Sequence, residues 1–206
     1  MEATIPPTAI KSAQLFTAKA KHTPPVLHHV QLTMGDRGWH LAAVDEYHLI
    51  SLGSSTSEDD PSWTLDLDFL AKELKTTDAD VKLLLPDDPY EEKGTAQIIH
   101  RKGYVRCEVP VYIYSEKRYP EWRRLIPDNA IDELHKVRLD PDFLLDVCKA
   151  AKLIGGDVEP TYRQKAYKVR GRDDYVTCYL PFYDIAPDDW RKKDWEAKCL
   201  VMPKCR

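Results

Sequence analysis

Lysines are the residues of this chain whose type and spacing best suit a chemical task, the attraction of phosphate. They recur in three segments with helical periodicity, each time opposite the apolar stripe. The set comprises Lys11, Lys19, Lys21, Lys72, Lys75, Lys149 and Lys152, with His22 beside the first group. Ammonium groups along a helix contact phosphates without reading bases, so three such helices could face one polyanion. The alternative is that each lysine lies on an ordinary solvated helix face.

No group of residues in the sequence assembles a catalytic or metal site. The GxxxxGK[ST], GxGxxG and GxSxG motifs are missing from it. His28 and His29 are adjacent in a predicted strand, so their side chains point to opposite faces and cannot share a metal ion. The acidic pairs lack a spaced third ligand, and the C-terminal cysteines have no paired motif. We therefore expect no catalytic residue, no metal and no cofactor.

The net charge of −4 argues against a simple basic nucleic-acid binder. The average hides a local bias, because no acidic residue occurs between Ala3 and Gly35, whereas acids cluster elsewhere, as in residues 58–60. Segregated charge can steer a charged partner even when the total is slightly negative.

The bulk composition indicates an ordinary soluble protein of one large domain or two small ones, with 206 residues, 43% hydrophobic and 31% charged. No apolar run is long enough to span a membrane, and the N-terminus does not resemble a secretion signal. The five cysteines are odd in number and lack a CxxC pair. They are typical of reduced thiols in a cytoplasmic protein.

Helices and strands can be placed from periodicity and turn signals. Helices are predicted over residues 8–22, capped by Thr8, over residues 66–77, and from the cap Asp140 through Pro141 to Gly155. Strands are predicted over residues 26–34, 38–53, 81–86, 95–101, 104–114, 166–171, 174–183 and 198–205. Each unit runs from a helix into two or three strands, so the fold class is α+β.

A connector rich in proline and aromatic residues, KRYPEWRRLIP (117–127), separates two such units. Pro120 and Pro127 each remove a backbone donor and favour extended geometry in the residue before them. We therefore expect neither a helix nor a central strand here. The large apolar side chains of the connector must still pack against something.

Three stretches resemble motifs of the bacterial DNA polymerase III beta sliding clamp family, and they occur in the family's order. They are AAVDEYHLI (42–50), KRYPEWRRLIP (117–127) and CLVMPKC (199–205). The first is the loosest, because Val44, Glu46, Tyr47 and His48 replace the usual Thr, Gly, His and Arg. In the third, Lys204 stands where Met is usual.

The resemblance implies DNA-clamp domains, with antiparallel sheets outside and helices lining a central channel. Residues 1–118 resemble the family's middle domain, residues 119–127 its inter-domain connector, and residues 128–206 a shortened last domain. The family's first domain and the first half of its last domain would then be missing. The seven lysines and His22 would contact duplex DNA in the channel, while the outer surface stays acidic.

The resemblance also implies a hydrophobic groove for client peptides beside the connector. Its residues would be Leu27, Val44, Leu49, Pro120, Arg124, Leu125, Val201, Met202 and Pro203. Proline walls, branched aliphatic side chains and an adaptable methionine suit an apolar slot that is partly preformed. The alternative is that these residues only cement two domains together.

The function implied is that of a non-enzymatic processivity factor, which encircles duplex DNA as a homo-oligomeric ring. A DNA polymerase and a clamp loader would dock through short linear peptides. Three helices per chain predict a tetramer, and the short chain favours a phage or another mobile element as its source. One alternative is a clamp-derived adaptor or decoy that binds clamp-binding peptides without encircling DNA. Another is an unrelated α+β enzyme.

Overall fold

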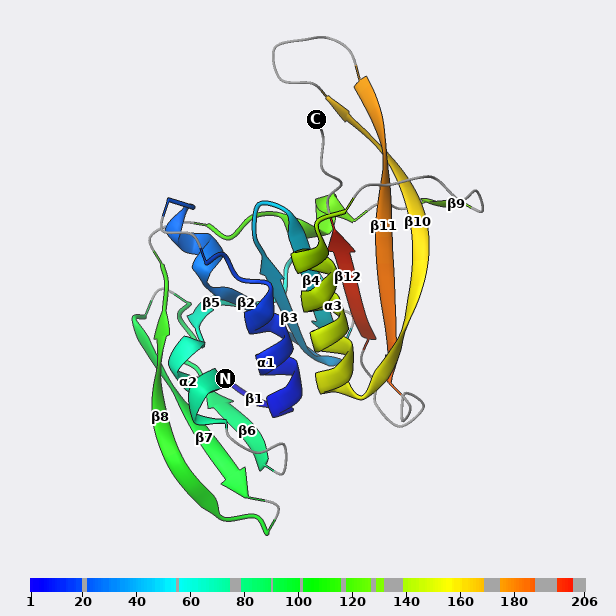
Figure 1. Cartoon of the computed structure of the whole chain (residues 1–206). Helices are drawn as coiled ribbons and strands as arrows, with labels where there is room; N and C mark the ends of the chain where they lie inside the picture. The colour runs from blue at the N-terminus through cyan, green and yellow to red at the C-terminus, as the bar shows by residue number, and fades with distance from the viewer. Residues whose placement is uncertain are drawn as a thin grey trace.

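A short strand, a helix and three antiparallel strands follow one another three times along the chain (Figure 1). The first copy holds β1 (Glu2–Ile5), α1 (Pro7–Leu15), the 3-10 helix η1 (Pro25–His28), β2 (Val30–Gly35), β3 (Gly38–Val44) and β4 (His48–Gly53). The second holds β5 (Ser62–Asp66), α2 (Asp68–Glu73), β6 (Ala79–Leu84), β7 (Lys93–His100) and β8 (Val105–Ile113). After the 3-10 helix η2 (Trp122–Leu125), the third holds β9 (Asn129–Ile131), α3 (Pro141–Ile154), β10 (Gly156–Lys168), β11 (Tyr175–Pro187) and β12 (Glu196–Val201).

The structure is a computed structural model. It describes residues 1–19, 22–54, 56–74, 79–89, 91–100, 102–115, 118–126, 129–131, 139–168, 175–187 and 196–201.

The described strands form one antiparallel sheet in the order β1-β6-β7-β8-β5-β2-β3-β4-β12-β11-β10-β9. The first two copies exchange their first strands, since β1 pairs with β6 and β5 pairs with β2. The third copy keeps its own, because β9 pairs with β10. The first and third copies join through β4 and β12, whose pairing runs from Glu196↔Gly53 to Val201↔His48. The domain boundary placed at residue 118 stays a prediction.

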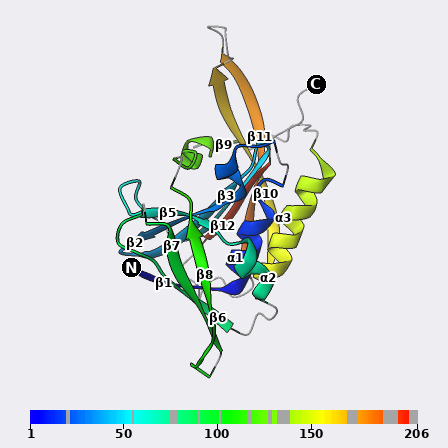
Figure 2. The ribbon, with the colours of Figure 1, turned by 90° about the vertical axis from the view of Figure 1, so that its left-hand side faces the viewer.

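All three α-helices lie on one face of the sheet, with α1 between α2 and α3 (Figures 1 and 2). The main core fills the space between helices and sheet, where Phe16 and Trp63 are fully buried. Burial alternates along β6, as expected for a strand with one covered and one open face. The predicted α+β class and clamp-like layering are therefore confirmed.

Helix α3 has the bounds that local signals predicted. The side chain of Asp140 accepts a hydrogen bond from the N–H of Asp142, and Pro141 is the first helical residue. Gly155 ends the helix with φ +76°, a left-handed conformation that glycine adopts without strain.

Helix α1 is shorter than predicted, because it ends at Leu15 rather than at residue 22. Thr8 does not cap it: Pro6 occupies the cap position and makes no side-chain hydrogen bond there. Beyond the helix, the N–H of Ala18 donates to the carbonyl of Leu27 at 2.8 Å, which turns the chain back onto η1. A backbone hydrogen bond to η1 therefore overrides helical propensity here.

Other elements differ in type or bounds from the prediction, because tertiary contacts or turns determine them. Residues 26–28, predicted as strand, belong to η1, and the connector contains η2 although its prolines predicted no helix. The predicted strand over residues 38–53 is two strands, because Asp45 accepts the N–H groups of Tyr47 and His48 at 2.7 Å and closes a turn. Strands β1, β5 and β9 were not predicted, and α2 begins only after β5 ends.

Candidate DNA and peptide interfaces

The helical face carries most of the lysines that the sequence singled out. Lys11 lies on α1, Lys72 on α2, and Lys149 and Lys152 on α3, and these three helices lie on the same face of the sheet. Lys19 and His22 follow α1 as exposed residues outside any helix. Lys21 and Lys75 lie outside the described residues.

Acidic side chains compensate three of these lysines. Asp146 of α3 is nearly buried, and its two carboxylate oxygens lie 3.3 Å from the Nζ of Lys19 and 3.1 Å from the Nζ of Lys149. Lys72 pairs with Asp68, one turn earlier on α2, at 2.5 Å. Among the described residues, Lys11 and Lys152 have no acidic side chain within ion-pair distance. The helical face is therefore less positive than the lysine pattern alone predicts.

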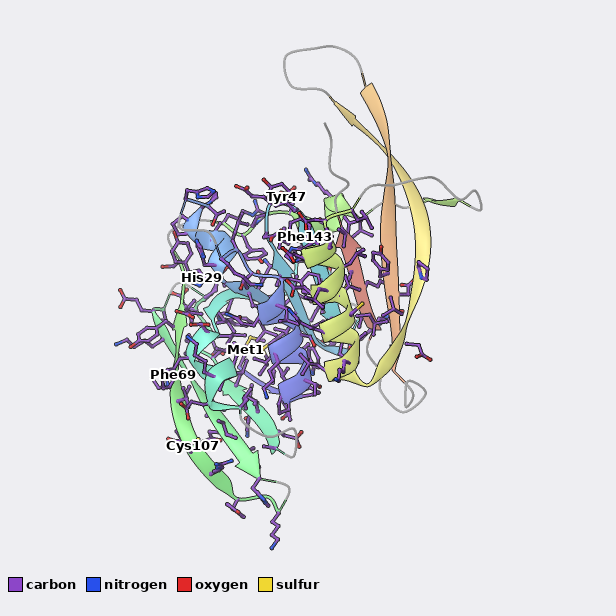
Figure 3. The ribbon with its side chains drawn as sticks, viewed as in Figure 1. Met1, His29, Tyr47, Phe69, Cys107 and Phe143 are labelled. Carbon is purple, nitrogen blue, oxygen red and sulfur yellow. The ribbon has the colours of Figure 1, made fainter. Side chains whose placement is uncertain are left out.

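His48 lies buried where the first and third copies meet. Its ring stacks on Phe16 of the first copy at 4.5 Å and contacts Phe143 of α3 at 4.8 Å. Nδ1 lies 2.7 Å from the Asp45 oxygen that accepts two backbone N–H groups, but this contact does not have hydrogen-bond geometry. Nε2 lies 3.7 Å from Oδ2 of Asp146. Figure 3 shows Phe143 beside Tyr47 at the upper end of α3.

Tyr119 anchors the connector to the sheet. Its hydroxyl accepts the N–H of Val44 at 3.1 Å and lies 3.2 Å from the carbonyl oxygen of His29, to which it can donate. Burial is the main reason that the pKa of this phenol is raised well above its ordinary value. Tyr119 is therefore a neutral, fully bonded anchor.

Trp122 is the second anchor. Its indole N–H donates to the side-chain oxygen of Gln31 at 2.7 Å, and its ring stacks on His40. The guanidinium of Arg123 lies 4.6 Å from the centre of the same indole. The sequence had signalled that these connector aromatics must pack, but the predicted groove omitted both Tyr119 and Trp122.

Some predicted groove residues gather beneath these anchors. Leu27, Val44 and Leu49 form one buried cluster with Tyr119, Trp122 and Leu200. Val201 is buried in the neighbouring main core instead. These positions thus converge, and the rings of Tyr119 and Trp122 pack in the same cluster.

The remaining predicted groove residues lie at the edge of this cluster or outside the described residues. Pro120 is half-buried, and Arg124 is exposed and paired with Glu121 at 2.8 Å. The side chain of Leu125 is outside the described part, as are Met202 and Pro203.

A polar hollow of about 510 Å³ adjoins the connector and was not predicted. It is lined by Gln31, Thr33, Glu58, Asp60, Ser62, Thr64, Pro89, Tyr114, Ser115, Arg118, Tyr119, Pro120, Glu121, Trp122 and Arg123. Hydroxyl, carboxylate and guanidinium groups dominate this wall, so it is not the apolar groove. No local motif signals it, because its residues come from separate strands, loops and the connector.

Neither a metal-binding group nor a membrane-spanning helix is found in the described part of the chain. Within it, no three His, Cys, Asp or Glu side chains are grouped so that they could hold a metal ion. Its helices are too short or too polar to cross a membrane.

No protein-family model matches the sequence, and no curated protein matches it either. Solved structures do match the fold along nearly the whole chain. The DNA polymerase III subunit beta of Borrelia burgdorferi, in complex with a natural product, has a TM-score of 0.53 at 12% identity, covering 100% of this chain and 63% of that one.

Two further structures agree. The beta subunit of Thermotoga maritima has a TM-score of 0.53 at 9% identity, covering 98% of this chain and 64% of that one. The beta subunit of Pseudomonas aeruginosa has a TM-score of 0.53 at 10% identity, covering 100% and 67%. The chain thus spans about two thirds of the length of the clamps it matches, and at these identities the similarity shows the fold: over that part, this is the fold of a DNA polymerase III beta sliding clamp.

Proposed function

We propose that this protein is a DNA sliding clamp, a non-enzymatic processivity factor that encircles duplex DNA in the cytoplasm as a homo-oligomer. The observation that carries the proposal is the placement of α1, α2 and α3 side by side on one face of a continuous sheet. A curved sheet with helices on its inner face can surround a duplex, so that topology rather than affinity keeps the protein on DNA.

In this proposal the main contacts with DNA phosphates come from Lys11 and Lys152. Lys19, Lys72 and Lys149 contribute less, because each forms an ion pair with an acidic side chain. A sliding ring needs weak contacts, because each tight phosphate contact must break before the ring moves. Each uncompensated lysine adds a salt-sensitive, sequence-independent attraction. Few free lysines therefore suit a protein that slides.

The peptide side rests on the connector. Pro120 and Arg124 lie at the rim of a buried apolar cluster, and we propose that Leu125, Met202 and Pro203 complete a slot there with Leu27, Val44, Leu49 and Val201. Polymerase and loader peptides would insert an aliphatic side chain into this slot, while Arg124 binds an acidic flank.

Retention on DNA of defined topology tests the proposal. We expect the protein to stay on a nicked circular plasmid during gel filtration at 150 mM salt and to be lost when the plasmid is linearised. A loader or high protein concentration supplies the loading step. If the protein were lost equally from circular and linear DNA, the proposal that it encircles DNA would be wrong.

The second candidate is a clamp-derived adaptor, and the ion pairs of Asp146 and Asp68 favour it because they lower the positive potential of the helical face. An adaptor would bind a fluorescent clamp-binding peptide with micromolar or better affinity and would ignore both DNA forms. A clamp would bind the peptide and would also be retained on circular DNA. The two measurements on one preparation therefore separate the candidates.

A further inference from the structure

The hairpin formed by β7 and β8 is basic where the two strands meet. In Figures 1 and 2 this end of the hairpin lies below the helices, at the bottom of the molecule. The sequence from Lys93 to Cys107 contains no acidic residue, although acids precede and follow it. In a chain with a net charge of −4, the hairpin is therefore a local concentration of positive charge.

Lys102 and Arg106 are the exposed cations of the hairpin tip, by which we mean His100 and residues 102–106. Within the described part of the chain, neither cation has an acidic side chain at ion-pair distance. Asp80 of β6 lies opposite Ile99 of β7, but it forms no such pair with them there. Both charges are therefore available to an anionic ligand.

A β-bulge sets Arg106 apart from the strand ladder. Ile98 pairs with Cys107 and Ile99 pairs with Val105, so the register leaves Arg106 without a partner residue on β7. A bulge bends its strand and re-aims the side chain of the extra residue. The exposed guanidinium of Arg106 is therefore not part of the regular face of the sheet.

An open aromatic face accompanies these two cations. Tyr104 stands between Lys102 and Arg106 in the sequence. Its ring stacks on the imidazole of His100, with ring centres 4.8 Å apart and planes 13° from parallel. Tyr104 is 54% exposed, so the ring face turned away from His100 is open to solvent. Such a face is a surface on which an unpaired base can stack.

Hydrogen bonds within the hairpin tip hold this arrangement in place. The N–H of Gly103 donates to the carbonyl of His100 at 2.7 Å, and the N–H of His100 donates to the carbonyl of Tyr104 at 2.9 Å. The N–H of Lys102 donates to Nδ1 of the His100 ring at 3.2 Å, which orients the imidazole. Gly103 has φ +82°, a conformation that glycine adopts without strain. The tip is therefore preformed, and a ligand would order little of it on binding.

We propose that the hairpin tip binds single-stranded DNA, with one base stacked on Tyr104 and neighbouring phosphates contacted by Lys102 and Arg106. Positive charge alone would attract duplex and single strand alike. The aromatic face discriminates between them, because bases in a duplex already stack on their neighbours. Stacking accepts every base, so binding at the tip is tolerant of sequence.

The choice of DNA rather than RNA rests on the proposed function, since a polymerase held by a clamp copies a single-stranded template. Binding at the hairpin tip itself needs neither a ring nor a client peptide. Failure of tip binding would therefore leave the plasmid-retention test standing. Loss of retention on the circular plasmid would in turn leave the tip site standing.

Fluorescence anisotropy with labelled oligo(dT) tests the stacking contact. We expect Tyr104→Leu to weaken binding by roughly tenfold, because the side chain keeps its apolar bulk but loses the aromatic face. Tyr104→Phe should bind like the wild type. Tyr112→Leu is the matched control and should also bind normally: Tyr112 is a 53% exposed tyrosine of the same strand, but Nζ of Lys93 lies over its ring. Wild-type affinity in Tyr104→Leu would overturn the proposal.

Further probes separate stacking from charge. On an abasic strand of the same length, Tyr104→Leu and the wild type should bind equally, because no base is present to stack. Lys102→Gln and Arg106→Gln should each flatten a plot of log affinity for oligo(dT) against log salt by roughly 0.7 units. Equal weakening of Tyr104→Leu on oligo(dT), duplex and abasic strand, or an unchanged slope in both charge variants, would contradict the proposed site. Tighter binding of oligo(U) than of oligo(dT) would show that the assignment to DNA is wrong.

Discussion

The imidazole of His40 lies flat against the indole of Trp122, with ring centres 4.8 Å apart and planes 3° from parallel. His40 belongs to β3 and Trp122 to the connector, so this stack attaches the connector to the sheet. Nε2 of His40 lies 2.9 Å from the hydroxyl of Ser51. Burial, and then the positive charges of Arg123 and Lys198, lower the pKa of His40 to about 3.

This buried histidine predicts a fold that weakens in mild acid. The unfolded residue takes up a proton near pH 6.5, whereas the folded one does so only near pH 3, so stability is complete above pH 6.5 and falls as pH drops toward 3. The loss from His40 at pH 5 is about 2 kcal/mol. Urea unfolding of the wild type and of His40→Gln at pH 7.5 and pH 5 measures it. Identical pH dependence in the two proteins would contradict this assignment.

Removing the hydroxyl of Tyr119 should loosen the connector. Tyr119→Phe leaves the buried N–H of Val44 without its acceptor, so we expect the free energy of unfolding to fall by about 1–3 kcal/mol. Denaturant titration measures the change. Tyr47→Phe is the matched control, because Tyr47 is 52% exposed and its loss should be near zero. Equal effects from both substitutions would argue against a buried anchor.

Neutralising Asp146 should strengthen DNA binding, if the helical face contacts phosphate. Asp146→Asn releases Lys19 and Lys149, so a plot of log affinity against log salt should become steeper by roughly 1–2 units. Fluorescence anisotropy with a duplex measures this slope. Asp157→Asn, an exposed change at the start of β10, should leave it unaltered. An unchanged slope for Asp146→Asn would place DNA elsewhere.

Charge in the apolar slot should abolish peptide binding. We expect Leu125→Asp and Met202→Asp to lose a clamp-binding peptide by at least tenfold while keeping the wild-type circular dichroism spectrum, because a carboxylate in an apolar site must be desolvated. Leu145→Asp, at a 50% exposed position of α3, is the control and should bind normally. Wild-type affinity in both slot variants would show that the groove is placed wrongly.

The sequence by itself determined those features that depend on residues close together in the chain. The cap at Asp140, the proline after it and the left-handed Gly155 delimit α3, because each acts within one helical turn. The clamp resemblance was likewise legible in short motifs, and the structural matches agree with it. The sequence also placed lysines opposite the apolar stripes and required the connector aromatics to pack.

Tertiary structure alone decided what those residues face. Lys19 and Asp146 are 127 positions apart, yet their ion pair removes charge that a helical pattern counts as free. The exchange of β1 and β5, the early end of α1 and the packing of Leu49 in one cluster with Tyr119 and Trp122 are decided in the same way. The physical reason is that hydrogen bonds, burial and ion pairing act between groups that only folding brings together, and periodicity describes each segment by itself.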